Sequence, residues 1–374
     1  MRFVATCLFG IEKLVNEEID SLGLKRVQTL DGRVIFDGDV TDIPRLNINL
    51  RYAQRVLILL GEFEARTFTE LFDGVKALPL EEFVGRDDAF PVKGHSIRSA
   101  LYSIPDCQSI IKKACVERLK SKYGISYFEE TGVKYQIEFF ILKDNVHIMI
   151  DTSGTPLHKR GYRPTSNEAP IRETLAAALV KLAHTREDVL FWDPFCGSGT
   201  IPIEAAMLMT NTAPGLNREF ISENFPQIPK KCWYDAITEA NDKIIRNSGF
   251  EAFASDISPE CVEITNANVK RAGMEKHIKV FCRDALTIET FDRRGTVVCN
   301  PPYGERLMSA DEVEALYRNM GKAWQSLGSW QIYIISSCED FQRLYGRRAD
   351  AVRRLYNGMI RCNYYQYFRN KKKI

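Results

Sequence analysis

The chain has 374 residues, of which 45% are apolar, so it is too long for one ordinary domain and can fill the cores of two or three. A net charge of +2 excludes a chain-wide positive field, and any surface for nucleic acid must be a local patch. Ten cysteines without a close pair and five histidines without a local cluster argue against zinc and a disulfide framework, so we expect no metal.

The first residues, MRFVATCLFGIEKLVNEEID, become acidic too early for a signal peptide, and no later apolar run is long enough to span a bilayer. We therefore expect a cytoplasmic protein without a membrane partner. Residues 1–64 predict the order strand, helix, strand, strand, helix, strand of a ferredoxin-like unit. The segments are RFVATCL, GIEKLVNEEIDSLG, KRVQTL, GRVIFDG, TDIPRLNINLRY and QRVLILLGEFEA.

Residues 65–157 predict a second α+β unit, made of a helix, a strand, a long helix and a hairpin that turns at Asp144-Asn145. Its segments are TFTELFDGVKAL, AFPVKGHSI, SIIKKACVERLKSKYG and YQIEFFILKDNVHIMIDTS. The polar, proline-punctuated stretch TPLHKRGYRPTSNEAP has the composition of a linker to the rest of the chain.

Residues 158–374 alternate helices with short apolar strands, which predicts a doubly wound, largely parallel sheet covered by helices. The helices are APIRETLAAALVKLA, IPIEAAMLM, CWYDAITEANDKIIRN and SPECVEITNANVKRAG, and the strands are VLFWDPF, EAFASD, IKVFCRDA, TVVCN and WQIYIISS. An antiparallel pair formed by residues 355–358 and IRCNYYQYF is expected to close one edge, with NYYQYF as an edge strand that packs one face.

Open sheets of this kind bind ligands beyond the carboxyl ends of their strands, and four polar sites fall there. The first is DPFCGSGT, residues 193–200, in which Asp193 ends a strand and a glycine turn opens a helix. Gly197 and Gly199 let the backbone approach a ligand, and the Asp193 carboxylate can accept from an amino group or water. Pro202 stands where a dinucleotide site needs a third glycine, and no P-loop motif follows, which argues against redox and NTP-dependent enzymes.

Asp256, Asp284 and Asn300 are the other three sites, each after a further strand. An acid in the place of Asp256 can hold ribose hydroxyls, and Asp284 or its neighbouring backbone can accept from an adenine amino group. Either aspartate alone is also an ordinary helix cap or turn residue. The four sites together, at the ends of consecutive strands, favour a ligand site.

The fourth site lies in VVCNPPYGERL, where two prolines stop the strand and hold Asn300 extended. The amide oxygen of Asn300 and the nearby carbonyls then form a fixed array of acceptors beside the flat ring of Tyr303. Such an array suits a planar ring with an amino group, such as an extruded nucleobase. For this motif by itself, a strand-terminating turn is the alternative.

The pair DPFCGSGT and NPPYGERL resembles the class I S-adenosylmethionine-dependent methyltransferases, and the whole chain resembles the THUMP-domain RNA guanine-N2 methyltransferases of the RlmL type, in the UPF0020 family. The resemblance implies a Rossmann-like class I methyltransferase sheet over residues 158–374, preceded by α+β ferredoxin-like and THUMP domains over residues 1–64 and 65–157. An element like Lys159-Arg160-Gly161-Tyr162-Arg163 joins these parts in the family. Longer RlmL-type enzymes carry a second methyltransferase after this unit, which the 374 residues do not include.

The same resemblance implies S-adenosylmethionine as the cofactor and RNA, in particular rRNA, as the partner. Asn300, Pro301, Pro302 and Tyr303 are then the catalytic residues that hold the target base. The implied cofactor contacts are Asp193, Pro194, Phe195, Cys196, Gly197, Gly199, Thr200, Asp256, Ile257, Asp284, Ala285 and Asn300.

Basic residues on the long helix of the second unit and in the linker are the expected contacts to RNA phosphates. On the helix they recur along a stripe that we expect to be exposed, beside strands without a catalytic constellation of their own. These residues are Lys112, Lys113, Arg118, Lys120, Lys159, Arg160 and Arg163.

The resemblance implies an enzyme, an S-adenosylmethionine-dependent RNA methyltransferase that forms N2-methylguanosine in 23S rRNA. Acceptors and a stacking ring do not tell guanine N2 from adenine N6, so N2-guanine methylation of tRNA and N6-adenine methylation of RNA or DNA are alternatives. A non-catalytic RNA-binding protein would be expected to lose the strand-end residues, which are all in place. A small-molecule methyltransferase would leave residues 1–157 without a role.

Overall fold

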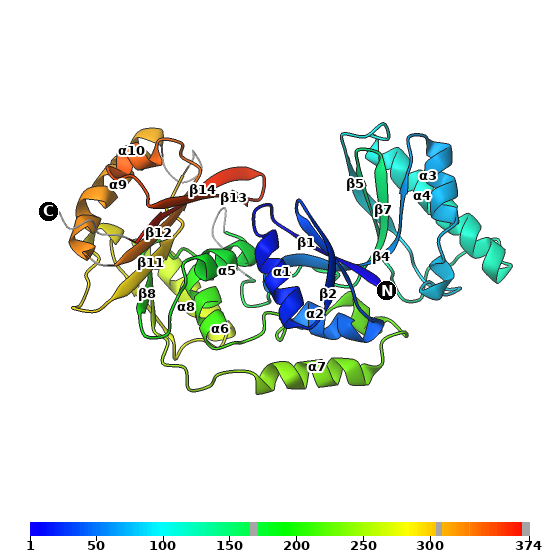
Figure 1. Ribbon diagram of the computed structural model, residues 1–374. Helices are drawn as coiled ribbons and strands as arrows, with labels where there is room; N and C mark the ends of the chain where they lie inside the picture. Colours follow the sequence, from blue (N-terminus) through cyan, green and yellow to red (C-terminus); the bar gives the residue numbers. More distant parts are fainter. Residues whose placement is uncertain (165–170, 304–308, 329, 369–374) are drawn as a thin grey trace.

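The computed structural model describes residues 1–164, 171–303, 309–328 and 330–368. Residues 2–151 build one seven-stranded sheet and residues 190–367 build a second one. Figure 1 shows the first sheet at the centre and right and the second at the left. The predicted architecture, a doubly wound α/β sheet preceded by α+β units, is confirmed.

The first sheet has the strand order β2-β3-β1-β4-β7-β6-β5, and its pairs are antiparallel except for β5 with β6. Alternation along the strands directs Phe3, Ala5 and Phe36 to one face, where they form a core with α1. The elements are β1 (Arg2–Cys7), α1 (Glu12–Ser21), β2 (Lys25–Leu30), β3 (Arg33–Asp37), α2 (Ile43–Asn49), β4 (Ala53–Glu64), α3 (Phe68–Lys76), β5 (Val92–Ile97), α4 (Ile104–Tyr123), β6 (Ile137–Leu142) and β7 (Asn145–Asp151).

The hairpin between β6 and β7 turns one residue earlier than predicted. Leu142 pairs with Asn145, so the turn residues are Lys143 and Asp144. Both have positive φ, at 50° and 67°, which is typical of the tight turn that matches the twist of two antiparallel strands.

Strand β4 is shared by the two halves of the first sheet. Residues 53–58 pair with β1, and residues 57–64 pair with β7. The predicted border between residues 64 and 65 falls where β4 ends, yet the hydrogen-bonded sheet continues across both units.

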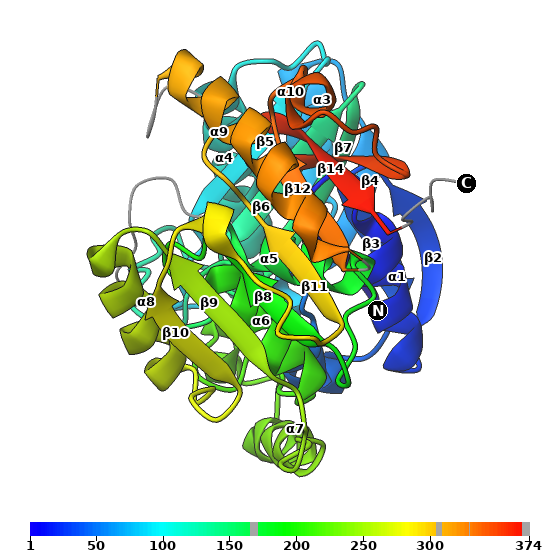
Figure 2. The same ribbon diagram turned by 90° about the vertical axis from the view of Figure 1, so that its left-hand side faces the viewer.

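The second sheet has the strand order β10-β9-β8-β11-β12-β14-β13. Its first five strands are parallel, whereas β14 runs antiparallel to both neighbours. Figure 2 shows α9 crossing in front of these strands and α5 behind them. The elements are α5 (Glu173–Leu182), β8 (Leu190–Asp193), α6 (Thr200–Met209), α7 (Lys230–Asp242), β9 (Ala252–Asp256), α8 (Pro259–Arg271), β10 (Ile278–Cys282), β11 (Gly295–Cys299), α9 (Ala310–Ala323), β12 (Gln331–Ser336), α10 (Phe341–Tyr345), β13 (Ala351–Asn357) and β14 (Ile360–Tyr367).

The prediction for the tyrosine-rich strand is wrong, because β13 and not β14 forms the edge. Both faces of β14 are also covered. On one face, the Tyr364 hydroxyl donates to the Leu179 carbonyl of α5 at 2.9 Å. On the other face, the Tyr365 ring stacks on the Phe341 ring of α10, with 4.6 Å between the ring centroids. Residue alternation within one strand does not reveal that a second helix layer covers its other face.

The segment between α6 and β9 returns to the first sheet. Its helix α7 packs against α2, and Nε of Arg45 lies 3.0 Å from a carboxylate oxygen of Glu239. Figure 1 shows α7 running below α2, away from the strands of the second sheet. The C-terminal part of the chain is therefore attached to the N-terminal part by more than the linker.

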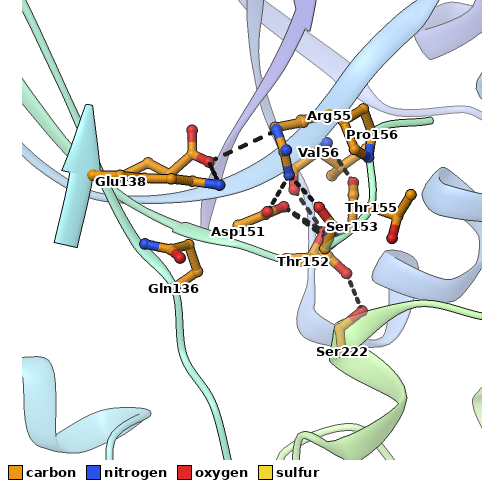
Figure 3. Close-up of polar contacts among 12 residues, drawn as sticks. Arg55, Val56, Gln136, Glu138, Asp151, Thr152, Ser153, Thr155, Pro156 and Ser222 are labelled. Carbon is orange, nitrogen blue, oxygen red and sulfur yellow. Dashed lines mark hydrogen bonds and ion pairs between the residues drawn. The ribbon is translucent and has the colours of Figure 1, made fainter. Parts of the chain in front are cut away.

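A polar network marks the junction between the two parts (Figure 3). The Asp151 carboxylate at the end of β7 pairs with Arg55 of β4, and the Arg55 guanidinium also donates to the Gly154 carbonyl at 2.6 Å. From the segment before α7, the Ser222 hydroxyl donates to the Thr152 carbonyl at 2.6 Å. A cavity of about 450 Å³ lies beside this network, lined among others by Gln136.

We expect Arg55→Ala to destabilise the protein by about 3 kcal/mol at pH 8 and by clearly less at pH 5. The Asp151 carboxyl is 1% exposed, and burial raises its pKa to about 6 even with Arg55 beside it. In the Arg55→Ala variant, the Asp151 carboxylate has lost this cation, so keeping it ionised at pH 8 destabilises the folded protein. At pH 5 the carboxyl is largely protonated because its pKa is raised, and most of this destabilisation disappears.

Chemical unfolding of the variant at the two pH values measures this effect. Arg55→Ala combined with Asp151→Asn is the control, because it removes the Asp151 charge, while Glu138, the other acid beside Arg55, keeps Lys93 as a partner at 3.2 Å. The loss of stability in this double variant should be similar at the two pH values. An equal loss of stability at both pH values in the single variant would contradict the role of the Asp151 charge.

Candidate active site

The four predicted strand-end residues lie along one edge of the second sheet. Strands β10, β9, β8 and β11 are neighbours in that order, and Asp284, Asp256, Asp193 and Asn300 follow their carboxyl ends. The chain runs outward from β8 to β10 and then returns to β11 on the other side of β8. This reversal is the switch point at which open α/β sheets bind ligands, and Asp193 and Asn300 flank it.

The turn after β8 is built so that its backbone lies open to the site. Gly197 and Gly199 have φ of 54° and 80°, which favour glycine. A Cβ atom on Gly199 would lie 2.8 Å from the Thr265 side chain of α8, so no larger residue fits without a shift. The Thr265 hydroxyl donates to the Gly197 carbonyl at 2.9 Å and holds the turn from below.

Asp193 is buried and has no cationic partner among the described residues. Its Oδ1 accepts only from the Phe195 backbone N–H, at 3.1 Å. Burial, and after it the negative charge of Asp256, raises the pKa of the Asp193 carboxyl well above its usual range. An uncompensated acid in this position suits a ligand that brings positive charge or N–H donors.

Asp256 and Ile257 form the next part of the edge. The two carboxylate oxygens of Asp256 accept from the backbone N–H groups of Gly197 and Ser258, both at 3.0 Å, so the acid ties β9 to the glycine turn. Ile257 follows it and is 69% exposed. A fixed acid beside an exposed apolar side chain suits a ribose next to a flat base.

Asp284 caps the short turn that follows β10, since its Oδ1 accepts from the Leu286 N–H at 2.9 Å. The Ala285 carbonyl is occupied by the indole N–H of Trp324, at 2.8 Å. The second carboxylate oxygen of Asp284 is therefore the acceptor left for a ligand beside β10.

Some predicted cofactor contacts direct their side chains inward. Pro194 is buried, the thiol of Cys196 lies 3.6 Å from the Thr265 hydroxyl, and the Thr200 hydroxyl accepts from Arg163 at 2.7 Å.

Asn300 carries an acceptor with no partner. Its side-chain oxygen is buried and makes no hydrogen bond within the described parts of the chain. Such a group is rare in a folded protein, and its hydrogen-bonding capacity is left for a ligand. The neighbouring Pro302 carbonyl is already occupied, because it accepts from the Tyr317 hydroxyl at 2.9 Å.

Tyr303 is held by residues that the sequence alone did not single out. The side-chain amide of Asn357, at the tip of β13, donates to the Tyr303 hydroxyl at 2.9 Å. The thiol of Cys362 on β14 lies 4.0 Å from the same oxygen. Asn357 lies 54 residues from Tyr303 in the sequence, and no spacing rule connects the two. The rest of the NPPYGERL motif, residues 304–308, lies outside the described residues.

We expect Asn357→Ala to lower kcat about tenfold and leave the affinity for the expected cofactor, S-adenosylmethionine, unchanged. The reason is that the ring of Tyr303, the expected stacking partner of the target base, loses its tether. Asn357→Asp, whose carboxylate can still accept from the tyrosine hydroxyl, should recover most of the activity. Steady-state kinetics on RNA, with separate titration of the cofactor, checks this. A variant with wild-type kcat would show that the contact does not orient the ring.

The basic residues of α4 do not form the predicted exposed stripe. Lys112 pairs with Glu130 at 2.5 Å, and Lys120 pairs with Glu117 at 3.1 Å. Arg118 donates through two nitrogens to Glu81 and lowers the pKa of that carboxyl to about 2. Because these cations already pair with carboxylates, they are less available to bind RNA phosphates.

The basic residues of the linker differ in exposure and in their contacts. Arg160 is 2% exposed and donates to the backbone carbonyls of Leu157 and Arg51, so the prediction that it contacts RNA is wrong. Arg163 is also inside, 3.0 Å from Glu173. Lys113 and Lys159 are exposed and make no ion pair with described residues. Arg160 joins the two parts of the chain through the Arg51 carbonyl, whereas Arg163 has its partners within the C-terminal part. Composition alone could not distinguish these uses of a basic linker from RNA binding.

Comparison with known proteins gives the same architecture. Residues 160–366 match the RMKL-like methyltransferase domain (UPF0020), residues 2–57 the RlmL ferredoxin-like domain and residues 65–151 the THUMP domain. The chain is 44% identical to YpsC of Bacillus subtilis (strain 168), named as a candidate RNA methyltransferase, over 98% of this chain and 95% of that one.

Two further relatives extend the comparison. The ribosomal RNA large subunit methyltransferase K/L of Psychromonas ingrahamii is 30% identical over 94% of this chain, which spans 48% of that protein. The crystal structure of SMU.472, a candidate methyltransferase complexed with SAH, has a TM-score of 0.93 at 39% identity and covers 100% of this chain and 99% of its own.

The fold and the strand-end residues define a class I methyltransferase, the class that takes its methyl group from S-adenosylmethionine. The chain belongs to the UPF0020 family of RMKL-like methyltransferases, with RlmL ferredoxin-like and THUMP domains before the catalytic part. The predicted family and cofactor are confirmed. The open glycine turn and the uncompensated Asp193 fit this cofactor.

Among the described residues, no group of three His, Cys, Asp or Glu side chains is arranged to hold a metal ion. No helix in the described ranges combines the length and apolarity needed to cross a membrane.

Proposed function

We propose that this protein transfers the methyl group of S-adenosylmethionine to the exocyclic N2 amine of a guanine in ribosomal RNA, forming N2-methylguanosine in 23S rRNA. The observation that carries the proposal is the buried Asn300 side-chain oxygen at the switch point, which has no hydrogen-bond partner in the described parts of the chain. The THUMP domain and the rRNA methyltransferase among the relatives support RNA as the substrate.

Bound S-adenosylmethionine supplies an electrophilic methyl group, and the residues for it are those of the strand edge. Asp193 with the glycine turn would hold the methionine part, Asp256 the ribose, and Asp284 with Ile257 the adenine. Because the Asp193 carboxyl is buried, it ionises readily only when positive charge is bound beside it.

The target amine is a poor nucleophile, since its lone pair is delocalised into the ring. The Asn300 oxygen and the Pro301 carbonyl would accept the two amino hydrogens and concentrate negative charge on the nitrogen. The Pro302 carbonyl is not used for this, because Tyr317 donates to it. The nitrogen lone pair forms the new N–C bond as the methyl–sulfur bond breaks, and the surplus proton passes to water. Tyr303 would stack on the base, a contact worth about 1–3 kcal/mol.

The test is methyl transfer from labelled S-adenosylmethionine to total RNA from cells that lack this protein, followed by nucleoside analysis and separation of rRNA from tRNA. N2-methylguanosine in the large rRNA would support the proposal in full. The same nucleoside in tRNA would change the substrate. N6-methyladenosine would change the target amine, which the acceptor array does not discriminate. Cofactor binding without transfer would favour a non-catalytic RNA-binding protein.

A further inference from the structure

The antiparallel ribbon β13–β14 overhangs the edge of the sheet that carries the Asn300 motif. Ser336 ends β12 and pairs with Asn363, so residues 357–362 extend past the carboxyl ends of the parallel strands. At the tip, Asn357 is bonded to Tyr303, as described above. The ribbon therefore lies next to the proposed base site.

The ribbon also contacts the N-terminal unit, through residues of both its faces. The Arg353 guanidinium donates to the Gly10 carbonyl at 2.8 Å, and the rings of Tyr356 and Phe9 meet edge to face at 5.7 Å. Glu12, the acid nearest to this contact in sequence, accepts from the backbone N–H groups of Gly10 and Gly32. The ribbon is thus fixed between two parts of the protein.

Residues 347–368 contain five arginines and a single acid, although the whole chain has a net charge of only +2. The Arg353 side chain donates a hydrogen bond to the Gly10 carbonyl. Arg347 pairs with Asp350, which is the only acid of the segment. The other three arginines, Arg348, Arg354 and Arg361, are exposed, and their side chains make neither an ion pair nor a hydrogen bond within the described ranges. On α4, in contrast, Lys112, Arg118 and Lys120 have carboxylate partners.

Cations and an aromatic ring share one face of this ribbon. Directly paired residues of antiparallel strands project to the same side, and Tyr356 pairs with Arg361 while Arg354 pairs with Asn363. Phe9, which is 51% exposed, continues the surface beside Tyr356. Guanidinium groups interleaved with rings are typical of surfaces that hold single-stranded nucleic acid, since the cations contact phosphates and the rings stack on bases.

We propose that this ribbon face, defined by Phe9, Arg354, Tyr356 and Arg361, binds the single-stranded RNA that flanks the target nucleotide. The two arginines contact phosphates, and Tyr356 with Phe9 stacks on a neighbouring base. Extrusion of one nucleotide into the site requires that the adjacent strand is held close to it, and the tether from Asn357 to Tyr303 places the ribbon there. This inference rests on the proposed RNA methyltransferase function.

The experiment compares Arg354→Gln/Arg361→Gln with two controls, Arg354→Lys/Arg361→Lys and Arg246→Gln. Arg246 is an exposed arginine between α7 and β9, at the opposite end of the parallel strands, and has no ion pair within the described ranges. Binding of a short, fluorescently labelled single-stranded RNA of mixed sequence is titrated at several KCl concentrations. S-adenosylmethionine binding and melting temperature are measured for every variant.

We expect the double glutamine variant to bind RNA about tenfold more weakly, with the slope of log K against log salt reduced by about 1.4, since each lost phosphate contact removes about 0.7. The lysine pair and Arg246→Gln should keep the wild-type slope, and cofactor binding should not change in any variant.

Wild-type affinity and slope in the double glutamine variant would overturn the inference and assign the ribbon to a protein partner. An equal loss in Arg246→Gln would overturn it too, because the effect would then follow net charge and not the ribbon. Wild-type methyl transfer to RNA tests the proposed function separately. If the wild-type protein methylates RNA and the ribbon variants bind RNA normally, only the proposed ribbon surface is disproved. If the wild-type protein neither binds nor methylates RNA, both the ribbon surface and the proposed function are disproved.

Discussion

Replacing Asn300 with alanine is expected to lower methyl transfer to RNA by about 10²–10³-fold or more, with the S-adenosylmethionine affinity changed by less than about threefold. The buried oxygen of Asn300 has no partner within the described residues, so its hydrogen-bonding capacity is left for the target amine. An acceptor that acts on the amine in the transition state contributes to the rate and little to cofactor binding.

Single-turnover methyl transfer and calorimetric titration of the cofactor separate these two effects. The melting temperature serves as the control for folding, and it should not fall, because the substitution removes an unsatisfied buried acceptor. A variant that loses cofactor affinity along with activity would show that Asn300 belongs to the cofactor site and not to the base site.

Asp193→Asn is expected to have opposite effects on binding and on stability. The buried carboxyl has a raised pKa, so its ionised form costs stability in the cofactor-free protein. We expect the variant to melt about 2–4 °C higher at neutral pH, the shift that about 1 kcal/mol gives in a domain of this size. Its S-adenosylmethionine affinity should fall by about 30-fold or more, since loss of a buried charged partner costs about 2–5 kcal/mol.

The pH dependence of this effect has a definite sign. A carboxyl whose pKa is raised by folding contributes most stability below its ordinary pKa and loses it as the pH rises towards the raised value. The difference in melting temperature between Asp193→Asn and the wild type should therefore be small at pH 4 and grow with pH. Thermal unfolding across this range checks it, and a difference that is constant with pH would mean that the Asp193 charge is not the cause.

Sequence patterns predicted the second sheet well because each strand there is short, apolar and followed by a polar residue at the same edge. Asp193, Asp256, Asp284 and Asn300 were expected on consecutive strands, and the strand order brings them to four neighbouring strands. The parallel connections with their helices leave little freedom in this arrangement.

Contacts between distant parts of the chain could not be predicted in the same way. The contact between Asn357 and Tyr303 depends on where the ribbon β13–β14 docks, which no local pattern encodes. The basic residues show the same limit. Arg118 and Arg160 have the composition of a nucleic-acid surface, and only the fold shows that Glu81 and backbone carbonyls already occupy them.

The sharing of strand β4 limits how the chain can be divided. A fragment that began at the border between residues 64 and 65 would keep β7 and its neighbour β6 but lose β4 on the other side of β7, and would expose a row of unpaired backbone groups. Such an edge invites self-association, so aggregation of an isolated THUMP fragment would report on the missing strand and not on the domain. A separable RNA-binding piece of this protein should begin no later than Ala53, the first residue of β4.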